Sequence, residues 1–268
     1  MHKPLLSLSF DDGRKDQYYN VMPLLEKYQI PATFNITTGY IEGRVKAAEK
    51  PAMSESELLE MIGCPLFEIA GHGDMHTNDL DDIALGRKKL LDYANLPHST
   101  PIGFASPGSG IYLDYIEEHE DLLRNMGFSY IRTSLRIKSK YLLRTFSRKA
   151  ARVIHSPMLY QIAYNDTVQK AVDGLAVVSI PVMFDITLNQ LKRIVRFTEK
   201  QRGWTVIMFH SIEKPDSEYY HDTWNWDYDQ FEQFLKFINE ERNNGRLDIT
   251  TTIDGYRIMR EMDVKGIV

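Results

Sequence analysis

The stretch "LLSLSFDDG", residues 5–13, joins an apolar run to two adjacent carboxylates and a glycine. A short apolar run bounded by turn residues is typical of a buried β-strand. Asp11 and Asp12 would then lie side by side at the end of that strand, although like charges repel each other. Turn chemistry or capping of the next helix would explain the pair, and so would a bound cation.

Seven further β-rich runs follow and alternate with helical patterns. They are "PATFNIT" (31–37), "LFEIAG" (66–71), "IGFASP" (102–107), "FSYIRTS" (128–134), "LAVVSIPV" (175–182), "TVIMFH" (205–210) and "DITTTI" (248–253). Such alternation predicts a parallel sheet, either closed as a barrel or open and doubly wound. In both architectures the chemistry gathers at the carboxyl ends of the strands.

Helix signals separate these runs. Ser54 and Glu57 form a capping-box pattern. Residues 187–202 carry apolar side chains on one face, and Gly203 is placed to end that helix. Another helix is expected to begin at about Asp229.

Length and composition favour one domain. The 268 residues are 43% hydrophobic, which is enough for one large core, so we expect a single domain over residues 1–268. The 32 basic and 37 acidic residues nearly balance, and we expect no nucleic-acid partner. Cys64 is the only cysteine, which excludes an internal disulfide and a cysteine-rich zinc cluster.

The first residues show no charged region followed by an apolar segment and a small-residue cleavage site. The most apolar later run, "GLAVVSIPVMF" (174–184), is shorter than the roughly 20 residues that cross a bilayer, and Pro181 interrupts it. We therefore expect a cytoplasmic protein without a transmembrane segment.

Two histidines follow the third β-rich run, in "EIAGHGDMHTNDL" (68–80). His72 and His76 are four residues apart, a spacing that can bring two imidazoles onto one metal, although a structural role fits such a pair equally well. Two histidines and one aspartate would make a three-ligand site with an open position for water, as in hydrolytic zinc sites. One aspartate of the pair could then bind the cation while its neighbour acts as a general base.

His210 follows the run "TVIMF" and would emerge at the same rim as the aspartates. A histidine in that place could serve as a general acid, or it could be satisfied by backbone carbonyls. No G-x-G-x-x-G or Walker-type loop follows the first strand, which disfavours dinucleotide binding and phosphoryl transfer.

Together these segments resemble the polysaccharide deacetylases of the NodB-homology type, also called carbohydrate esterase family 4. The matching segments, in chain order, are "SFDDG" (9–13), "IPATFNIT" (30–37), "GHGDMHTNDL" (71–80), "GFASPGSG" (103–110), "GFSYIRTS" (127–134) and "GWTVIMFHSI" (203–212). The fourth is similar to the F-A-x-P form of the third motif, which marks a subgroup. The resemblance covers nearly the whole chain.

The resemblance implies a distorted (β/α)7-type barrel that hydrolyses N-acetyl groups, less often O-acetyl groups, on sugars. Asp11 corresponds to the catalytic base and His210 to the general acid. Asp12, His72 and His76 correspond to the ligands of a divalent metal, with zinc favoured and cobalt, nickel or manganese as alternatives.

The third motif departs from the commoner pattern. Many members place there an arginine that organises the base, whereas this chain has Ala105 two residues before Pro107. Arg132, near the end of the next strand, could take over that role, or it could be an ordinary ion pair at the rim. We expect Pro107, Gly108 and Arg132 to contact the substrate.

Residues 132–152 form the strongest charge asymmetry of the chain. They hold eight basic residues and no acidic one: Arg132, Arg136, Lys138, Lys140, Arg144, Arg148, Lys149 and Arg152. A basic amphipathic helix here could contact anionic lipid or a phosphate on the substrate. A solvated helix packed on the barrel would explain the same pattern.

Aromatic residues cluster in "EYYHDTWNWDYDQF" (218–231), just after His210. Trp224 and Trp226 are expected to form a wall on which a sugar ring stacks, because apolar ring faces suit pyranose faces. A lid packed on the barrel, with no ligand contact, would have the same composition.

The sequence therefore predicts metal-dependent deacetylation of an N-acetylated sugar or glycan. One alternative is a deformylase or amidase that acts on another small N-acyl sugar carried on a nucleotide or lipid. Another is a catalytically silent carbohydrate-binding relative, or a purely structural protein, although the five candidate residues are all intact in type.

Overall fold

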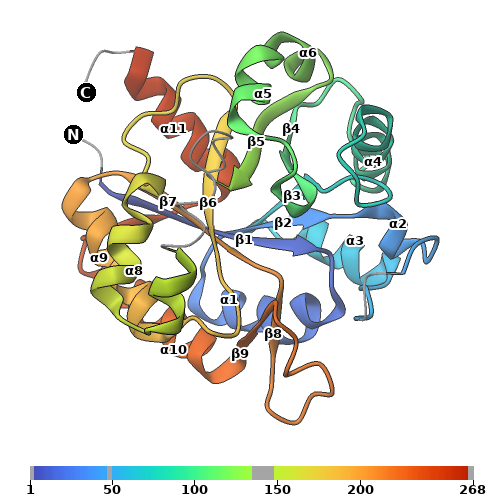
Figure 1. Cartoon of the computed structure of the whole chain (residues 1–268). Coiled ribbons are helices and arrows are strands. Elements are labelled where there is room, and N and C mark those ends of the chain that lie inside the picture. The colour runs from blue at the N-terminus through green and yellow to red at the C-terminus, as the bar shows by residue number, and fades with distance from the viewer. Residues whose placement is uncertain (1–2, 47–49, 135–147, 265–268) are drawn as a thin grey trace.

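The computed structural model describes residues 3–46, 50–134 and 148–264. At its centre, parallel strands close into a barrel, because the first strand pairs with both the second and the seventh (Figure 1). The barrel strands are β1 (Leu5–Asp12), β2 (Ala32–Ile36), β3 (Phe67–Gly71), β4 (Ile102–Ala105), β5 (Phe128–Ser134), β6 (Ala176–Pro181) and β7 (Trp204–Phe209). The expected distorted (β/α)7-type barrel is confirmed.

Helices connect the strands and surround the barrel (Figure 1). They are α1 (Met22–Tyr28), α2 (Thr38–Ile41), α3 (Glu55–Gly63), α4 (Leu80–Tyr93), α5 (Leu113–Glu118), α6 (Glu120–Asn125), α8 (Pro157–Ala163), α9 (Leu188–Gln201), α10 (Tyr228–Asn243) and α11 (Thr252–Val264). Short π- or 3₁₀-helical turns lie at Gln17–Val21 (η1), Pro107–Ser109 (η2) and Asn165–Thr167 (η4). Residues 148–153 are also helical.

The local helix signals act as expected. The Ser54 hydroxyl accepts a hydrogen bond from the Glu57 amide, and the Glu57 carboxylate accepts one from the Ser54 amide, which confirms the capping box of α3. The predicted helix at 187–202 is α9, and the left-handed residue that ends it is Arg202 (φ 54°) rather than Gly203.

Alternation along β1 gives the barrel a polar interior. Leu6, Leu8 and Phe10 belong to the main hydrophobic core. The residues between them are polar: the Ser9 hydroxyl accepts a hydrogen bond from Asn35 Nδ2 (2.8 Å), and the same nitrogen donates to Asp11 (2.8 Å). Because side chains of a strand alternate between its two faces, Asp11 continues the polar series and Asp12 does not.

Three short strands complete the structure. β10 (Asp248–Ile249) pairs with the start of β1, at Leu5 and Leu6, while β2 joins β1 only from Ser9 onward. β8 (Ser211–Glu213) and β9 (Asn225–Asp227) form a separate parallel ladder, and the loop between them projects from the barrel (Figure 1). All eight predicted strands are present, and β8 and β9 are additional.

No helix in the described part of the chain combines the length and the apolar character needed to span a membrane. Most of the basic segment, residues 135–147, lies outside the described residues.

Candidate active site

The two adjacent aspartates at the end of β1 have different surroundings, and both are buried. Asp12 and Gly13 both have positive φ (83° and 75°), so the chain turns sharply as it leaves the strand. A positive φ at a residue other than glycine is unfavourable and is found mainly at turns, helix ends and functional sites. The turn sends the two carboxylates toward different partners.

Asp12 faces the two predicted histidines. Its Oδ1 lies 3.4 Å from His72 Nε2 and 3.3 Å from His76 Nε2. The three residues can each offer one ligand atom, and these atoms all lie within 4.8 Å of one another. The structure thus brings together the predicted metal-binding set.

The donor atoms of this cluster fit a cation. His72 Nδ1 donates to the carbonyl oxygen of Ala105 (2.8 Å), which leaves the lone pair of Nε2 free. Asp12 Oδ1 and His72 Nε2 are both buried and, within the described residues, have no hydrogen-bond partner. Buried polar atoms without partners are costly, and a metal ion would satisfy both.

The electrostatics of the cluster also favour a bound cation. Burial alone raises the pKa of Asp12, but its close contacts with His72 and His76 and the charge of Arg14 hold this pKa well below its usual value. Burial lowers the pKa of His72, but Asp11 and Asp12 outweigh it and raise the pKa above its usual value. The carboxylates therefore favour a positive partner beside them, either a proton or a metal ion.

The loop that carries both histidines is held from α4. Asp82 accepts hydrogen bonds from the amides of Met75 (2.6 Å) and Thr77 (3.1 Å). Gly73 has φ 80°, and a Cβ there would lie 2.6 Å from Asp82 Oδ2. Glycine at this position is thus required for the close approach that fixes the loop.

Asp11 contacts Arg132 instead of the histidines. Arg132 Nη2 donates to both carboxylate oxygens of Asp11 (2.6 Å each), and its Nη1 donates to Ser179 (2.9 Å). Burial raises the pKa of Asp11, but Arg132, His72 and His210 outweigh burial and lower the pKa below its usual value. Asp11 is therefore an ionised carboxylate of fixed orientation.

His210 follows β7 and lies half-buried beside Trp224, with ring centroids 4.5 Å apart. Its Nδ1 is buried and has no hydrogen-bond partner in the described part of the chain. Burial lowers the pKa of His210 to about 4, although Asp12 and Asp11 act in the opposite direction. The imidazole is therefore neutral near pH 7.

A cavity of about 120 Å³ lies beside Asp11 and His210 at the carboxyl end of the barrel. Its lining comprises Asp11, Ser106, Gly108, Ser109, Ser134, Pro181, Met208, His210 and Trp224. Of the residues expected to contact substrate, Gly108 and Trp224 line it. Pro107 is buried in η2, next to Gly108, and Arg132 lies buried behind Asp11.

The expectation that Trp226 forms a sugar-stacking wall is wrong. Only 1% of Trp226 is exposed, and its indole nitrogen donates to the carbonyl oxygen of Ile186 (2.7 Å). Its ring packs against Phe209 and Phe234 in the hydrophobic core. Trp224, two residues earlier, is 37% exposed and remains available at the cavity.

Sequence reasoning missed three residues that support the site. Arg14 forms an ion pair with Asp12, and Asn35 donates to Asp11. Gln17 Nε2 donates to the carbonyl oxygens of Asp11 (2.5 Å) and His210 (2.8 Å), so it ties the ends of β1 and β7 together. Asn35 lies beside Asp11 on the neighbouring strand, in register with it. Of the three residues, Asn35 alone could have been found by aligning the predicted strands.

The described ends of the basic segment make ordinary contacts. Arg132 lies inside the barrel, Arg148 pairs with Asp166 (3.2 Å) and Arg152 pairs with Asp185 (3.4 Å). These pairs give no support to a contact with lipid or phosphate.

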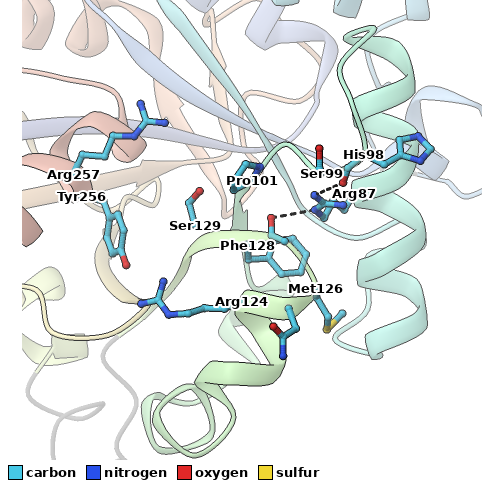
Figure 2. A pocket seen from close by; sticks show the side chains of 12 residues that line it. Arg87, His98, Ser99, Pro101, Arg124, Met126, Phe128, Ser129, Tyr256 and Arg257 are labelled. Carbon is cyan, nitrogen blue, oxygen red and sulfur yellow. Dashed lines mark hydrogen bonds between the residues drawn. The ribbon is translucent and has the colours of Figure 1, made fainter.

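A larger cavity of about 670 Å³ lies at the opposite end of the barrel, where β4 and β5 begin. Figure 2 shows Arg87, Arg124 and Arg257 on its walls. Arg87 donates to the carbonyl oxygens of Gly127, His98 and Thr100 and so holds the loop before β4. None of the predicted site residues lines this cavity.

Part of the chain is similar in sequence to known proteins. Residues 1–102 match the polysaccharide deacetylase family. A poly-beta-1,6-N-acetyl-D-glucosamine N-deacetylase of Staphylococcus aureus is 36% identical over 84 residues, which are 31% of this chain and 27% of the relative. The matched stretch thus spans about a quarter of the relative's length.

Two solved structures share the barrel. One is a Mycobacterium smegmatis protein that is named as a polysaccharide deacetylase. The alignment covers 97% of this chain and 92% of that protein, with a TM-score of 0.58 and 13% identity. The other is a peptidoglycan N-acetylglucosamine deacetylase. Its alignment covers 96% of this chain and 89% of that protein, with a TM-score of 0.52 and 14% identity. At this identity the two structures establish the fold alone. The similarity in sequence to the polysaccharide deacetylase family thus lies in residues 1–102 of this chain.

Proposed function

We propose that this chain is a metal-dependent hydrolase that removes N-acetyl groups from amino sugars of a glycan, with residues 1–268 as one catalytic domain. The observation that carries the proposal is the division between two adjacent carboxylates. Asp12 faces two histidines, while Asp11 is held by Arg132 and lines the cavity. The name of the S. aureus relative supports a β-1,6-linked N-acetylglucosamine polymer as substrate.

Asp12, His72 and His76 would hold the metal. One oxygen and two nitrogen donors with an open position suit zinc best, and cobalt, nickel or manganese also accept such donors. When bound, the metal supplies Lewis-acid polarisation of the acyl carbonyl.

Asp11 acts as the general base. It is ionised because Arg132 offsets its burial, and it takes a proton from the attacking water. The water oxygen bonds to the acyl carbon and the carbon–nitrogen bond breaks, which gives acetate and a free amine. His210 is neutral at rest, so the proton that it passes to the leaving nitrogen is the one that Asp11 took from the water, and Asp11 is ionised again at the end.

Gly108 and Trp224 line the same cavity as Asp11 and His210, and Pro107 lies in the turn that carries Gly108. We propose that the Trp224 ring stacks on the sugar, because this partly exposed ring lines the cavity beside His210.

Replacing Trp224 by alanine should raise KM roughly 3- to 10-fold and leave the fold intact, because an aromatic stack contributes about 0.5–1.5 kcal/mol. Steady-state kinetics on a soluble N-acetylglucosamine oligomer measures the change. Tyr19→Ala is the matched control, since Tyr19 is exposed and does not line the cavity. An unchanged KM in Trp224→Ala would remove Trp224 from the substrate site.

Replacing Arg132 by methionine should move the acid limb of the pH profile of kcat/KM to higher pH by about one unit or more. Arg132 lowers the pKa of the buried Asp11, so its loss raises this pKa, and the base then stays protonated up to a higher pH. Arg132→Lys keeps the charge and should shift the limb less.

Arg148→Met is the control for this series, since Arg148 pairs with Asp166 away from the cavity. A pH profile of Arg132→Met that overlays the wild type would show that Arg132 does not tune the base.

The function itself is tested by metal analysis coupled to acetate and formate release from a panel of N-acylated sugars and oligosaccharides. We expect bound zinc, acetate release from N-acetylglucosamine oligomers and loss of turnover after chelation. Formate release alone would favour the amidase alternative. No turnover on any substrate with metal bound would refute the catalytic proposal.

A further inference from the structure

We infer that Arg14 is a positioning residue that fixes which oxygen of Asp12 faces the metal, an inference that rests on the proposed function. Arg14 lies two residues after Asp12, on the far side of the turn at Gly13. It belongs to none of the segments that resemble the family's motifs.

The two oxygens of Asp12 are not equivalent. Arg14 Nε donates to Oδ2 (2.8 Å), and Arg14 Nη2 lies 2.7 Å from the same oxygen. Oδ1 has no hydrogen-bond donor within the described residues and lies between His72 and His76. The guanidinium thus occupies one oxygen and leaves the other for a cation, which limits Asp12 to a single ligand atom.

The backbone around Arg14 is fixed by a neighbouring segment. Arg14 forms an antiparallel bridge with Ala52, and the amide of Met53 donates to the carbonyl oxygen of Gly13 (3.0 Å). The side chain of Arg14 is 6% exposed, so it has little room to turn away from Asp12. The packing of the backbone therefore fixes the position of Arg14, independently of its contact with Asp12.

Acidic residues surround Arg14. Burial lowers the pKa of Arg14, but Asp12, Asp16 and Asp222 outweigh burial and raise this pKa. Lys50 Nζ lies 3.3 Å from Asp222 Oδ2, which offsets part of the negative charge of that carboxylate. Arg14 thus sits among three acidic residues and makes its short contacts with one of them, Asp12.

Two physical roles of Arg14 predict opposite results when the residue is removed. If Arg14 acted only as a nearby positive charge, its loss would strengthen cation binding, because like charges repel. If it positions Asp12, its loss leaves Oδ2 buried without a donor, and the carboxylate must rotate to find one. Metal affinity then falls, since partners that orient metal ligands typically contribute about 10- to 100-fold.

The test measures the zinc dissociation constant of the full chain after chelator treatment, by competition with a chromophoric chelator. We expect Arg14→Met to weaken zinc binding about 10-fold or more. Arg14→Lys keeps the charge but loses the two-pronged contact. Its zinc dissociation constant should lie between those of Arg14→Met and the wild type. Arg87→Met is the control for loss of a buried arginine, since Arg87 lies at the other end of the barrel.

Each outcome separates this inference from the proposed function. Zinc binding by the wild type with equal or tighter binding by Arg14→Met would refute the positioning role alone. No zinc binding by the wild type would refute the proposed function and the positioning role together. Thermal unfolding of the metal-free variants checks folding, and if Arg14→Met does not fold, a wild-type dissociation constant in Arg14→Lys overturns the inference.

Discussion

Replacing Asp11 by asparagine should lower kcat by about 10²- to 10⁴-fold while the zinc content of the protein stays at the wild-type level. Asparagine has the size of aspartate and can still accept a hydrogen bond from Arg132, but it cannot take a proton from water. Because Asp11 contacts Arg132 and Asn35 rather than the two histidines, the metal ligands keep their positions. Acetate release and metal analysis on the same sample measure both quantities.

Glu68→Gln is a matched control for this experiment, since Glu68 is a carboxylate bonded to Tyr130 and Thr33 near the opposite end of the barrel. It should leave kcat unchanged. An Asp11→Asn protein that retains zinc and turns over at the wild-type rate would exclude Asp11 as the base.

Replacing Asp12 by alanine should weaken zinc binding by more than about 100-fold, because even residues that only orient a ligand contribute 10- to 100-fold. The variant removes the oxygen that lies 3.4 Å from His72 and 3.3 Å from His76. Activity should be lost with the metal and should recover only partly at high zinc concentration. Equilibrium dialysis against zinc, followed by activity at each concentration, gives both results.

Asp11 and Asp12 serve as controls for each other, since they are adjacent, buried and equal in charge. We expect rate loss without metal loss in one variant and metal loss in the other. Equal loss of zinc in both variants would contradict the division of roles on which the proposed function depends.

The barrel could be predicted from the sequence because its strands are short runs rich in β-forming residues, which turn residues bound and helical patterns separate. Such regular alternation of strands and helices is typical of a parallel sheet. β8 and β9 were not predicted, because each has only three residues and no periodic pattern can appear over that length. Their pairing depends on the loop between them, which sequence patterns do not describe.

The metal-binding cluster was predicted because its signal lies in residue type and spacing. Asp12 ends a strand, and His72 and His76 follow another, so parallel strands bring all three to one rim. Arg14 and Gln17 were missed, because their role depends on the turn after β1 and on its contact with β7. Such contacts between segments distant in sequence leave no local pattern.

The error at Trp226 has a physical reason. Trp224 and Trp226 are two residues apart, and in one continuous strand they would share a face. β9 begins at Asn225, so Trp224 precedes the strand and Trp226 sits at its centre, facing the core. The sequence composition predicted aromatic rings near the site. Which of the two tryptophans faces the core depends on where β9 begins.

The pairing of β1 sets the order in which the barrel can form. One edge of β1 pairs with β7, about 200 residues later, and the start of its other edge pairs with β10, later still. Contacts at such separations form slowly, because the chain loses loop entropy before they stabilise it. In chain order the three candidate metal ligands all precede β4, yet β1 keeps an unpaired edge until β7 has been made. A nascent chain thus exposes an aggregation-prone strand edge while β2 to β6 are synthesised, and the seam of the barrel closes only with β7.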